Sequence, residues 1–259
     1  MNSARADRGA ESAFEAGRHR VIGAGAPAQS RAVIDLTELH FAWPRAGHDT
    51  LDVASLHVLA GEAVFVHGPS GCGKSTLLGL LAGVLVPTAG TVELMGQPFS
   101  ALRGAVRDRL RADHIGYLFQ QFNLLPYLSA LDNVQLPCRF SSRRARRAGD
   151  ARARACELLQ SVGLPEGRWR QAAAELSVGQ QQRVAAARAL IGSPELVIAD
   201  EPTSALDAAL RDAFMTLLLA QCRGNGSTLV FVSHDERLAE RFDRRLSLPA
   251  INRAAAAAA

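Results

Sequence analysis

The chain contains very little lysine, because 28 of its 29 basic side chains are arginine and the one lysine is Lys74. Surface charge needs only a cation, so a chain that favours arginine can exchange the two residues unless a site needs a compact ammonium. Long apolar runs are also missing: no stretch reaches about 18 consecutive apolar residues, which excludes a membrane-spanning helix. The single lysine therefore indicates a specialised site.

Paired cysteines and strong net charge are absent as well. Four cysteines lie far apart without a C-x-x-C pair, which favours reduced thiols in a cytosolic protein over a disulfide framework or zinc site. A net charge of +4 predicts no nucleic acid partner. Residues 1–30 lack the apolar run of a secretory signal, so we expect a disordered extension there, and residues 251–259 are predicted to be a low-complexity alanine tail.

Lys74 belongs to a glycine-rich motif of the form G-x-x-x-x-G-K-[ST], in which backbone N–H groups and a helix N-terminus cradle phosphates. The motif is flanked by a predicted buried strand, Ala63–His67, and a predicted apolar helix, Leu77–Ala82. A chance glycine-rich turn is the alternative interpretation. The motif residues are Gly68, Pro69, Ser70, Gly71, Cys72, Gly73, Lys74, Ser75 and Thr76.

Strand and helix patterns alternate along most of the chain, which predicts an α/β fold with a mostly parallel sheet. Two early strands, 32–41 and 51–59, predict a small antiparallel β region before this core. A helical subdomain is expected at about 122–176, with a helix from 143 to 162. Another helix is expected after it, from 178 to 191. The expected architecture is therefore a RecA-like P-loop NTPase core with an antiparallel β subdomain and an inserted α-helical subdomain.

Two carboxylates follow an apolar strand: Leu196–Ala199 leads directly into Asp200 and Glu201. This arrangement is typical of an aspartate that holds magnesium beside a glutamate that prepares the attacking water. Two acids at the end of a strand could also be structurally incidental.

A second anion site is predicted at the start of the helix from residue 178, where Ser177 is a natural N-cap and free N–H groups are available. With this segment the chain resembles the ATP-binding cassette (ABC) family, whose signature motif is similar to Ser177–Gln182, including Gly179 and Gln180. The resemblance implies that the signature of one subunit closes over the γ-phosphate held by another, in a head-to-tail dimer. Val178 replaces the glycine usual in this motif; a first-turn position tolerates it sterically and keeps its N–H.

The resemblance covers about residues 33–248 and implies an ABC ATPase domain over 31–250. Its remaining matches are Gln120, with Gln121 as the less favoured choice; Asp207, in a loop that crosses the dimer interface; and the switch histidine His234. Trp43 resembles the aromatic that stacks on adenine. Phe41 is its rival, and a core role for Trp43 is the alternative.

The resemblance also implies cofactors and roles. ATP and Mg²⁺ would be bound, with Ser75, Gln120 and Asp200 holding the metal. Glu201, His234 and Gln120 would be catalytic, and the phosphate loop with Trp43, Ser177, Gly179, Gln180 and Asp207 would bind nucleotide. The expected chemistry is in-line phosphoryl transfer to water.

Residues 116–126 and 131–134 resemble the lipoprotein-release and macrolide-efflux group, whose ATPase works beneath a separate membrane permease. This resemblance implies an exporter subunit held on the cytoplasmic face of the inner membrane by its permease. The apolar side chains at positions 124, 125, 127 and 128 are either buried helix residues or a groove for a permease helix.

The basic run Arg143–Arg147 favours a solvated helix surface, with binding of anionic headgroups as the alternative. A second functional class is an ABC ATPase of DNA repair or translation, which works without a permease. Such proteins usually carry two cassettes, zinc motifs or long coiled coils, and this chain has one cassette. A nucleotide kinase that shares only the phosphate loop has no use for Ser177 or His234.

Overall fold

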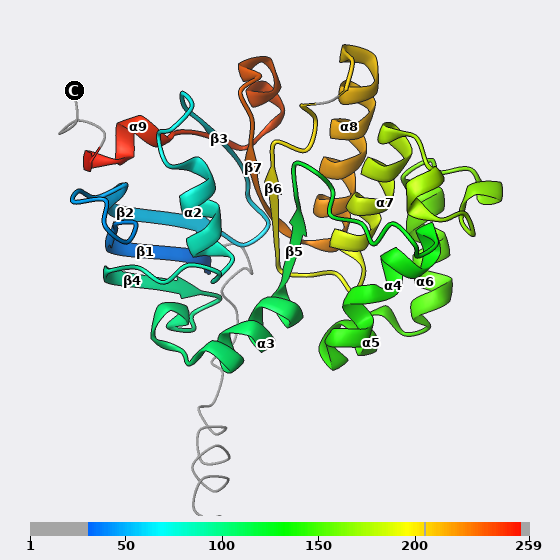
Figure 1. Cartoon of the computed structure of the whole chain (residues 1–259), viewed down its shortest axis with the longest axis horizontal. Coiled ribbons are helices and arrows are strands. Elements are labelled where there is room, and N and C mark those ends of the chain that lie inside the picture. Colours follow the sequence, from blue (N-terminus) through cyan, green and yellow to red (C-terminus); the bar gives the residue numbers. More distant parts are fainter. Residues whose placement is uncertain (1–30, 205, 255–259) are drawn as a thin grey trace, which may run out of the picture.

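The computed structural model describes residues 31–204 and 206–254 (Figure 1). The expectations for residues 1–30 and for most of the alanine tail lie outside this part of the chain. Two sheets and a group of helices make up the structure. Within the described ranges, no helix combines the length and apolarity needed to cross a membrane.

The core sheet has five parallel strands in the order β5-β6-β7-β3-β8. Strands β3, β6 and β7 at its centre are buried apolar runs, as the sequence predicts for a sheet covered on both faces. Their bounds are β3 Ala63–His67, β5 Ile115–Leu118, β6 Leu196–Asp200, β7 Thr228–Val232 and β8 Arg244–Ser247. The predicted mostly parallel α/β core is confirmed.

The antiparallel sheet has the order β2-β1-β4, with β1 at Ala32–Phe41, β2 at Leu51–Leu59 and β4 at Ala89–Leu94. Helix α2, Lys74–Leu81, lies beside this sheet in Figure 1. Its buried leucines share one apolar cluster with strands of both sheets. The phosphate loop, which ends in α2, is therefore supported from both sheets.

Five helices form the opposite side of the molecule, on the right of Figure 1. Their apolar faces join a second cluster that includes residues of β6 and β7. The bounds are α4 Ala130–Phe140, α5 Ser142–Ala148, α6 Ala151–Ser161, α7 Val178–Leu190 and α8 Ala208–Asn225. Helix α3, Gly104–His114, leads into β5, and short 3₁₀ turns lie at 99–101, 166–168, 173–175 and 236–241.

Three elements differ from the sequence prediction. Helix α4 lies within the helical subdomain expected at about 122–176, but no helix was assigned to its residues; it contains Pro137, near its end. The helix expected over 143–162 is two helices, separated where Gly149 adopts a φ of 66° and Asp150 caps α6. Strand β8 was missed because its polar residues at the edge of the sheet lack a buried-strand pattern.

The folded structure continues past the boundary expected at residue 250. Helix α9 spans Leu248–Ile251, and Asn252 after it is buried. The Asn252 amide donates to the carbonyl of Thr50 at 3.0 Å and to that of Cys72 at 3.3 Å. This end of the chain thus supports the phosphate loop from behind.

Candidate functional site

The phosphate loop joins β3 to α2, and its geometry depends on glycine. Gly73, the N-cap of α2, has a φ of 102°, and a Cβ there would lie 2.8 Å from the Leu51 side chain. The buried Lys74 donates from Nζ to the carbonyls of Gly68 and Pro69, both at 2.9 Å. The ammonium is thereby held at the mouth of the loop, within reach of any anion that the loop binds.

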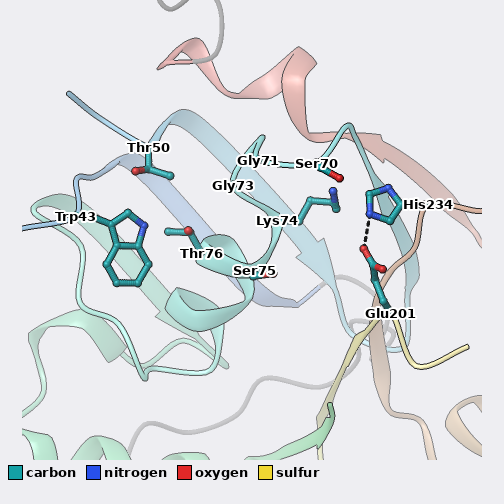
Figure 2. A pocket seen from close by; sticks show the side chains of 10 residues that line it. All are labelled: Trp43, Thr50, Ser70, Gly71, Gly73, Lys74, Ser75, Thr76, Glu201 and His234. Atoms are coloured by element: carbon teal, nitrogen blue, oxygen red, sulfur yellow. Dashed lines mark ion pairs between the residues drawn. The ribbon is translucent and has the colours of Figure 1, made fainter. Parts of the chain in front are cut away.

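A cavity of about 340 Å³ lies over this loop (Figure 2). Its lining combines a cation, loop amides, hydroxyls, a carboxylate, an imidazole and an indole, which suits an aromatic base linked to phosphates. The lining residues are Trp43, Thr50, Ser70, Gly71, Gly73, Lys74, Ser75, Thr76, Glu201 and His234. Thr50 was not predicted; it precedes β2, and a turn residue gives no sequence signal.

Glu201 and His234 face each other at one end of the cavity in Figure 2. The His234 Nε2 and Glu201 Oε1 atoms lie 2.6 Å apart. Glu201 adopts a φ of 45°, which is rare for a side chain of this size, and its N–H donates to the Val232 carbonyl at 3.0 Å. Strained backbone of this kind clusters at active sites.

Asp200 ends β6, directly before Glu201. Burial, and then the neighbouring Glu201 charge, raises the pKa of Asp200, although Lys74 opposes the shift. Burial of the Tyr117 side chain, and then the Asp200 charge, raises the pKa of Tyr117. Two carboxylates that are partly buried and close to one another are a favoured site for a divalent cation.

Trp43 and Phe41 separate into the two roles that the sequence left open. Phe41 is buried in the core, whereas Trp43 is 46% exposed and lines the cavity. The two rings meet edge to face, with centroids 5.2 Å apart. The geometry therefore favours Trp43 over Phe41 as the residue available for stacking.

Gln120 is exposed and does not line the cavity. It follows β5, and β5 pairs with β6 so that Leu118 lies opposite Ala199. The carboxyl ends of these parallel strands place Gln120 and Asp200 at the same edge of the sheet. Cys72, likewise outside the cavity lining, has its sulfur behind the loop, where a Cβ on Gly68 would lie 2.7 Å from it.

The predicted signature residues form the start of α7. Ser177 and Gln180 make a reciprocal capping box, in which the Ser177 N–H donates to the Gln180 side chain at 3.0 Å. Val178 is half exposed at the first helical position, as expected. Neither Ser177, Gly179 nor Gln180 lines the cavity that contains Lys74.

Asp207 is the N-cap of α8 and accepts from the Leu210 N–H at 2.9 Å. It also lies outside the lining of the cavity. The structure thus brings together the phosphate loop, Trp43, Glu201 and His234, and it places the signature and Asp207 elsewhere on the chain.

Helix α7 contacts both loops that flank the site. Buried Gln182 donates to the Pro202 carbonyl at 2.9 Å, next to Glu201. Arg188 donates to the carbonyls of Phe122 and Asn123 at 2.5 and 2.7 Å, in the loop after Gln120. Sequence patterns missed these contacts because their partners lie far away along the chain.

Two surface expectations need correction. The basic run is not simply solvated surface, since Arg144 is only 3% exposed and donates to three backbone carbonyls. The apolar positions 124–128 are not helical. Tyr127 is 74% exposed, whereas Leu124 packs partly against the core, so a buried helix is the wrong interpretation of this segment.

Comparisons with known proteins agree with this geometry. A family model described as "ABC transporter" matches residues 51–204. The chain is 45% identical over 193 residues to the uncharacterized ABC transporter ATP-binding protein YbbA of Escherichia coli K12, an alignment that covers 74% of this chain and 83% of YbbA.

Solved structures give the same result. The dimeric MJ0796, described as a bacterial ABC transporter cassette, is 37% identical with a TM-score of 0.74, over 83% of this chain and 94% of that one. A dimeric post-hydrolysis form of MJ0796 bound to ADP and Pi has the same identity and TM-score, over 83% and 93% of the two chains. The cbiO1 subunit of the Clostridium perfringens ABC transporter complex cbiONQ is 26% identical with a TM-score of 0.67, over 80% of each chain.

The resemblance seen in the sequence is confirmed, and so is the P-loop NTPase fold. The match spans more than half of the chain, and the cavity is lined by the phosphate loop, a carboxylate and a histidine. The chain belongs to the ABC transporter family, as an ATP-binding and ATP-hydrolysing cassette.

Proposed function

We propose that this cassette works as a head-to-tail homodimer in which Lys74 of one copy and Ser177 of the other bind the same ATP. The observation that carries this proposal is the separation of two anion-binding elements within one chain. The phosphate loop lines the cavity, whereas the capped start of α7 lies outside it. The dimeric state of MJ0796 supports the dimer.

Each residue of the cavity has a distinct task in this proposal. The loop amides and Lys74 neutralise phosphate oxygens, and Trp43 stacks on the base. Glu201 orients the attacking water and accepts its proton, and its 2.6 Å contact with His234 holds the carboxylate in place. Ser177, Gly179 and Gln180 of the second copy donate to the γ-phosphate, and Asp207 lies in the loop between the two copies.

The residues proposed for the metal site suit Mg²⁺. Ser75 supplies a hydroxyl, Gln120 an amide oxygen and Asp200 a carboxylate, which are the hard oxygen ligands that Mg²⁺ prefers. The raised pKa of Asp200 is consistent with a carboxylate whose charge is best balanced by a cation. When bound, Mg²⁺ supplies charge neutralisation at the phosphate oxygens.

We further propose that the dimer drives a separate permease at the cytoplasmic face of the inner membrane, as an exporter of the lipoprotein-release or macrolide-efflux type. The exposed Tyr127 and the partly exposed Leu124, Leu125 and Leu128 form an apolar segment next to the loop after Gln120. A permease helix that binds there would contact the loop whose carbonyls accept from Arg188, and movement of this loop would be transmitted to α7. The alternative, a cassette of DNA repair or translation, is less favoured because the relatives are transporter proteins.

The Glu201→Gln variant tests the dimer. It keeps the shape of the side chain but loses the base, so hydrolysis should fall by about 10²-fold or more while ATP still binds. Size-exclusion chromatography with ATP and Mg²⁺ should then show a stable dimer, and ADP should leave a monomer. Rapid hydrolysis by this variant would refute the role of Glu201, and a monomer with bound ATP would refute the dimer.

Affinity purification from membranes tests the partner. Co-purification of a membrane protein that raises the ATPase rate is expected. Stimulation of ATPase by nucleic acid, without a membrane partner, would instead favour the alternative.

A further inference from the structure

We infer that Arg144 is a positioning residue for ATP hydrolysis, because it ties the C-terminal end of α7, the helix that begins at Ser177, to strand β5, which leads to Gln120. This inference rests on the proposed function of Ser177 in the dimer. It concerns a residue that contacts neither the cavity nor the signature itself.

Each of the three guanidinium nitrogens of Arg144 donates to a backbone carbonyl. Nη2 donates to Ala189 at 2.6 Å, Nε donates to Ile191 at 2.8 Å, and Nη1 donates to Ile115 at 3.3 Å. Burial lowers the pKa of Arg144 to about 10, which leaves it charged at neutral pH. A buried charge is costly unless it is hydrogen-bonded, so these three contacts favour one geometry of the side chain.

The three acceptors belong to two functional elements. Ala189 and Ile191 are at the C-terminal end of α7, where carbonyls lack partners within the helix and a cation is favoured. Ile115 is the first residue of β5, whose other end leads to Gln120. Arg144 therefore holds α7 and β5 at a common point, about 20 Å along α7 from Ser177.

The backbone also approaches this side chain closely. Gly192 has a φ of 69°, and a Cβ there would lie 2.7 Å from the Arg144 Cβ and carbonyl oxygen. On the adjoining strand, a Cβ on Gly116 would lie 2.2 Å from the Ala189 carbonyl oxygen. Glycine at these two positions therefore permits the close approach of α5, α7 and β5, because a larger residue would force these elements apart.

Charged neighbours orient helix α5 around this contact. Glu195, just before β6, accepts from Arg143, from Arg147 at 2.5 Å and from His114 at 3.0 Å. Ser141, which caps α5, donates to Asp113. The helix is held on both sides of Arg144, so the guanidinium has little freedom to follow α7 if α7 shifts.

These contacts fix the C-terminal end of α7, so they also determine where its N-terminal end, at Ser177, lies. Misplacement of reacting groups by about 1 Å can cost 10²-fold in rate, and a loosened end at Ala189 would shift Ser177 relative to the sheet. The phosphate loop has no contact with Arg144, so binding of ATP to one copy should be insensitive to its loss. By contrast, closure of the dimer and the rate of ATP turnover should both fall when Arg144 is replaced.

The test uses Arg144→Met and Arg144→Lys in the full chain, with Arg146→Met as the matched control. Arg146 lies on the same helix but is exposed. Four quantities are measured. The ATP affinity at low concentration and ATP-driven dimerisation are measured on chains that also carry Glu201→Gln, and kcat and KM on chains without that change. Circular dichroism reports folding.

We expect both Arg144 variants to bind ATP within about twofold of the parent and to lower dimerisation and kcat by about tenfold or more, with Lys less severe than Met because it keeps the charge but not the fork. Arg146→Met should change nothing. If Arg144→Met does not fold, Arg144→Lys decides. Unchanged kcat and dimerisation in a folded variant, or equal losses of ATP binding and turnover, would overturn the inference.

Failure of the underlying proposal would look different. In that case the parent Glu201→Gln chain would itself stay monomeric with ATP. A parent that dimerises together with variants that dimerise equally well would sink only the role of Arg144.

Discussion

Lys74 and Arg144 are the two basic side chains that are almost fully buried in the described part of the chain, at 7% and 3% exposure. Both donate to backbone carbonyls, but the partners differ in kind. Lys74 contacts carbonyls five and six residues away in its own loop, whereas the partners of Arg144 lie 29 to 47 residues away. One cation serves a local loop beside a cavity, and the other joins distant elements.

The chemistry of each side chain suits its region. A compact ammonium can leave two loop carbonyls for a phosphate without moving the backbone, and a planar fork cannot fit in that space. The fork is the better choice where several fixed carbonyls must be satisfied at once. The comparison explains why a chain that uses arginine almost everywhere keeps lysine at position 74.

The largest expected effect comes from exchanging the cation in the loop. Lys74→Arg keeps the charge, yet ATP hydrolysis should fall by at least about 10²-fold because the fork cannot occupy the place of the ammonium. Phosphate release is the measurement. The reverse exchange at an exposed position, Arg146→Lys, should leave the rate within about twofold. An active Lys74→Arg chain would remove the basis of the comparison.

Beside Arg144, Glu195 accepts hydrogen bonds from two arginines of α5 and from His114. Glu195→Gln should destabilise the fold by about 2 kcal/mol at pH 7, as expected for hydrogen bonds to a charged group. Partial burial raises the pKa of Glu195, but hydrogen bonds from His114 and Arg143 outweigh it and lower the pKa from 4.5 to about 2. The folded pKa is depressed, so the carboxylate stabilises the fold above pH 4.5. This contribution is lost as the pH falls toward 2.

Urea unfolding of both chains as a function of pH measures this difference. The gap between parent and Glu195→Gln should narrow steadily from about pH 5 downward. A difference in unfolding free energy that stays constant down to about pH 2 would mean that the charge of Glu195 does not stabilise the fold.

Trp43→Ala should raise the KM for ATP by about tenfold, which corresponds to the stacking free energy of one base on an aromatic ring. Trp43→Phe should have a smaller effect because a ring remains. Tyr127→Ala, at an exposed aromatic outside the cavity, is the control and should leave KM unchanged in the isolated chain. Equal KM values for Trp43→Ala and the parent would contradict stacking of Trp43 on the base and leave it a purely structural role.

The smallest effect is expected at the unusual residue of the signature. Val178 is half exposed at the first helical position, and its substitution by glycine keeps the N–H. Val178→Gly should therefore change kcat by about twofold or less. A change much larger than this, in either direction, would show that the side chain at this position controls closure of the dimer.

Much of the core could be predicted because its signals are local. The buried strands β3, β6 and β7 are continuous apolar runs, and Ser177 marks the start of α7 by its own capping chemistry. The phosphate loop needs its glycines and lysine in a fixed order. These parts depend on neighbours within a few residues.

Other parts could not be predicted because their partners are remote. Helix α4 contains Pro137, which local rules disfavour, but its face packs against α7. Asn252 follows a short terminal helix and is buried only because the carbonyls of Thr50 and Cys72 lie beside it. Neither environment can be read from the adjoining residues.

The sequence by itself determined the phosphate loop, the carboxylates at the end of β6, the cap of α7 and the family, because each is encoded by residue type at short spacing. Only the tertiary structure decided that Trp43 rather than Phe41 lines the cavity, that Glu201 meets His234, and that Arg144 is buried. The physical reason is that burial and pairing depend on groups from distant segments, and the sequence gives no distance between them.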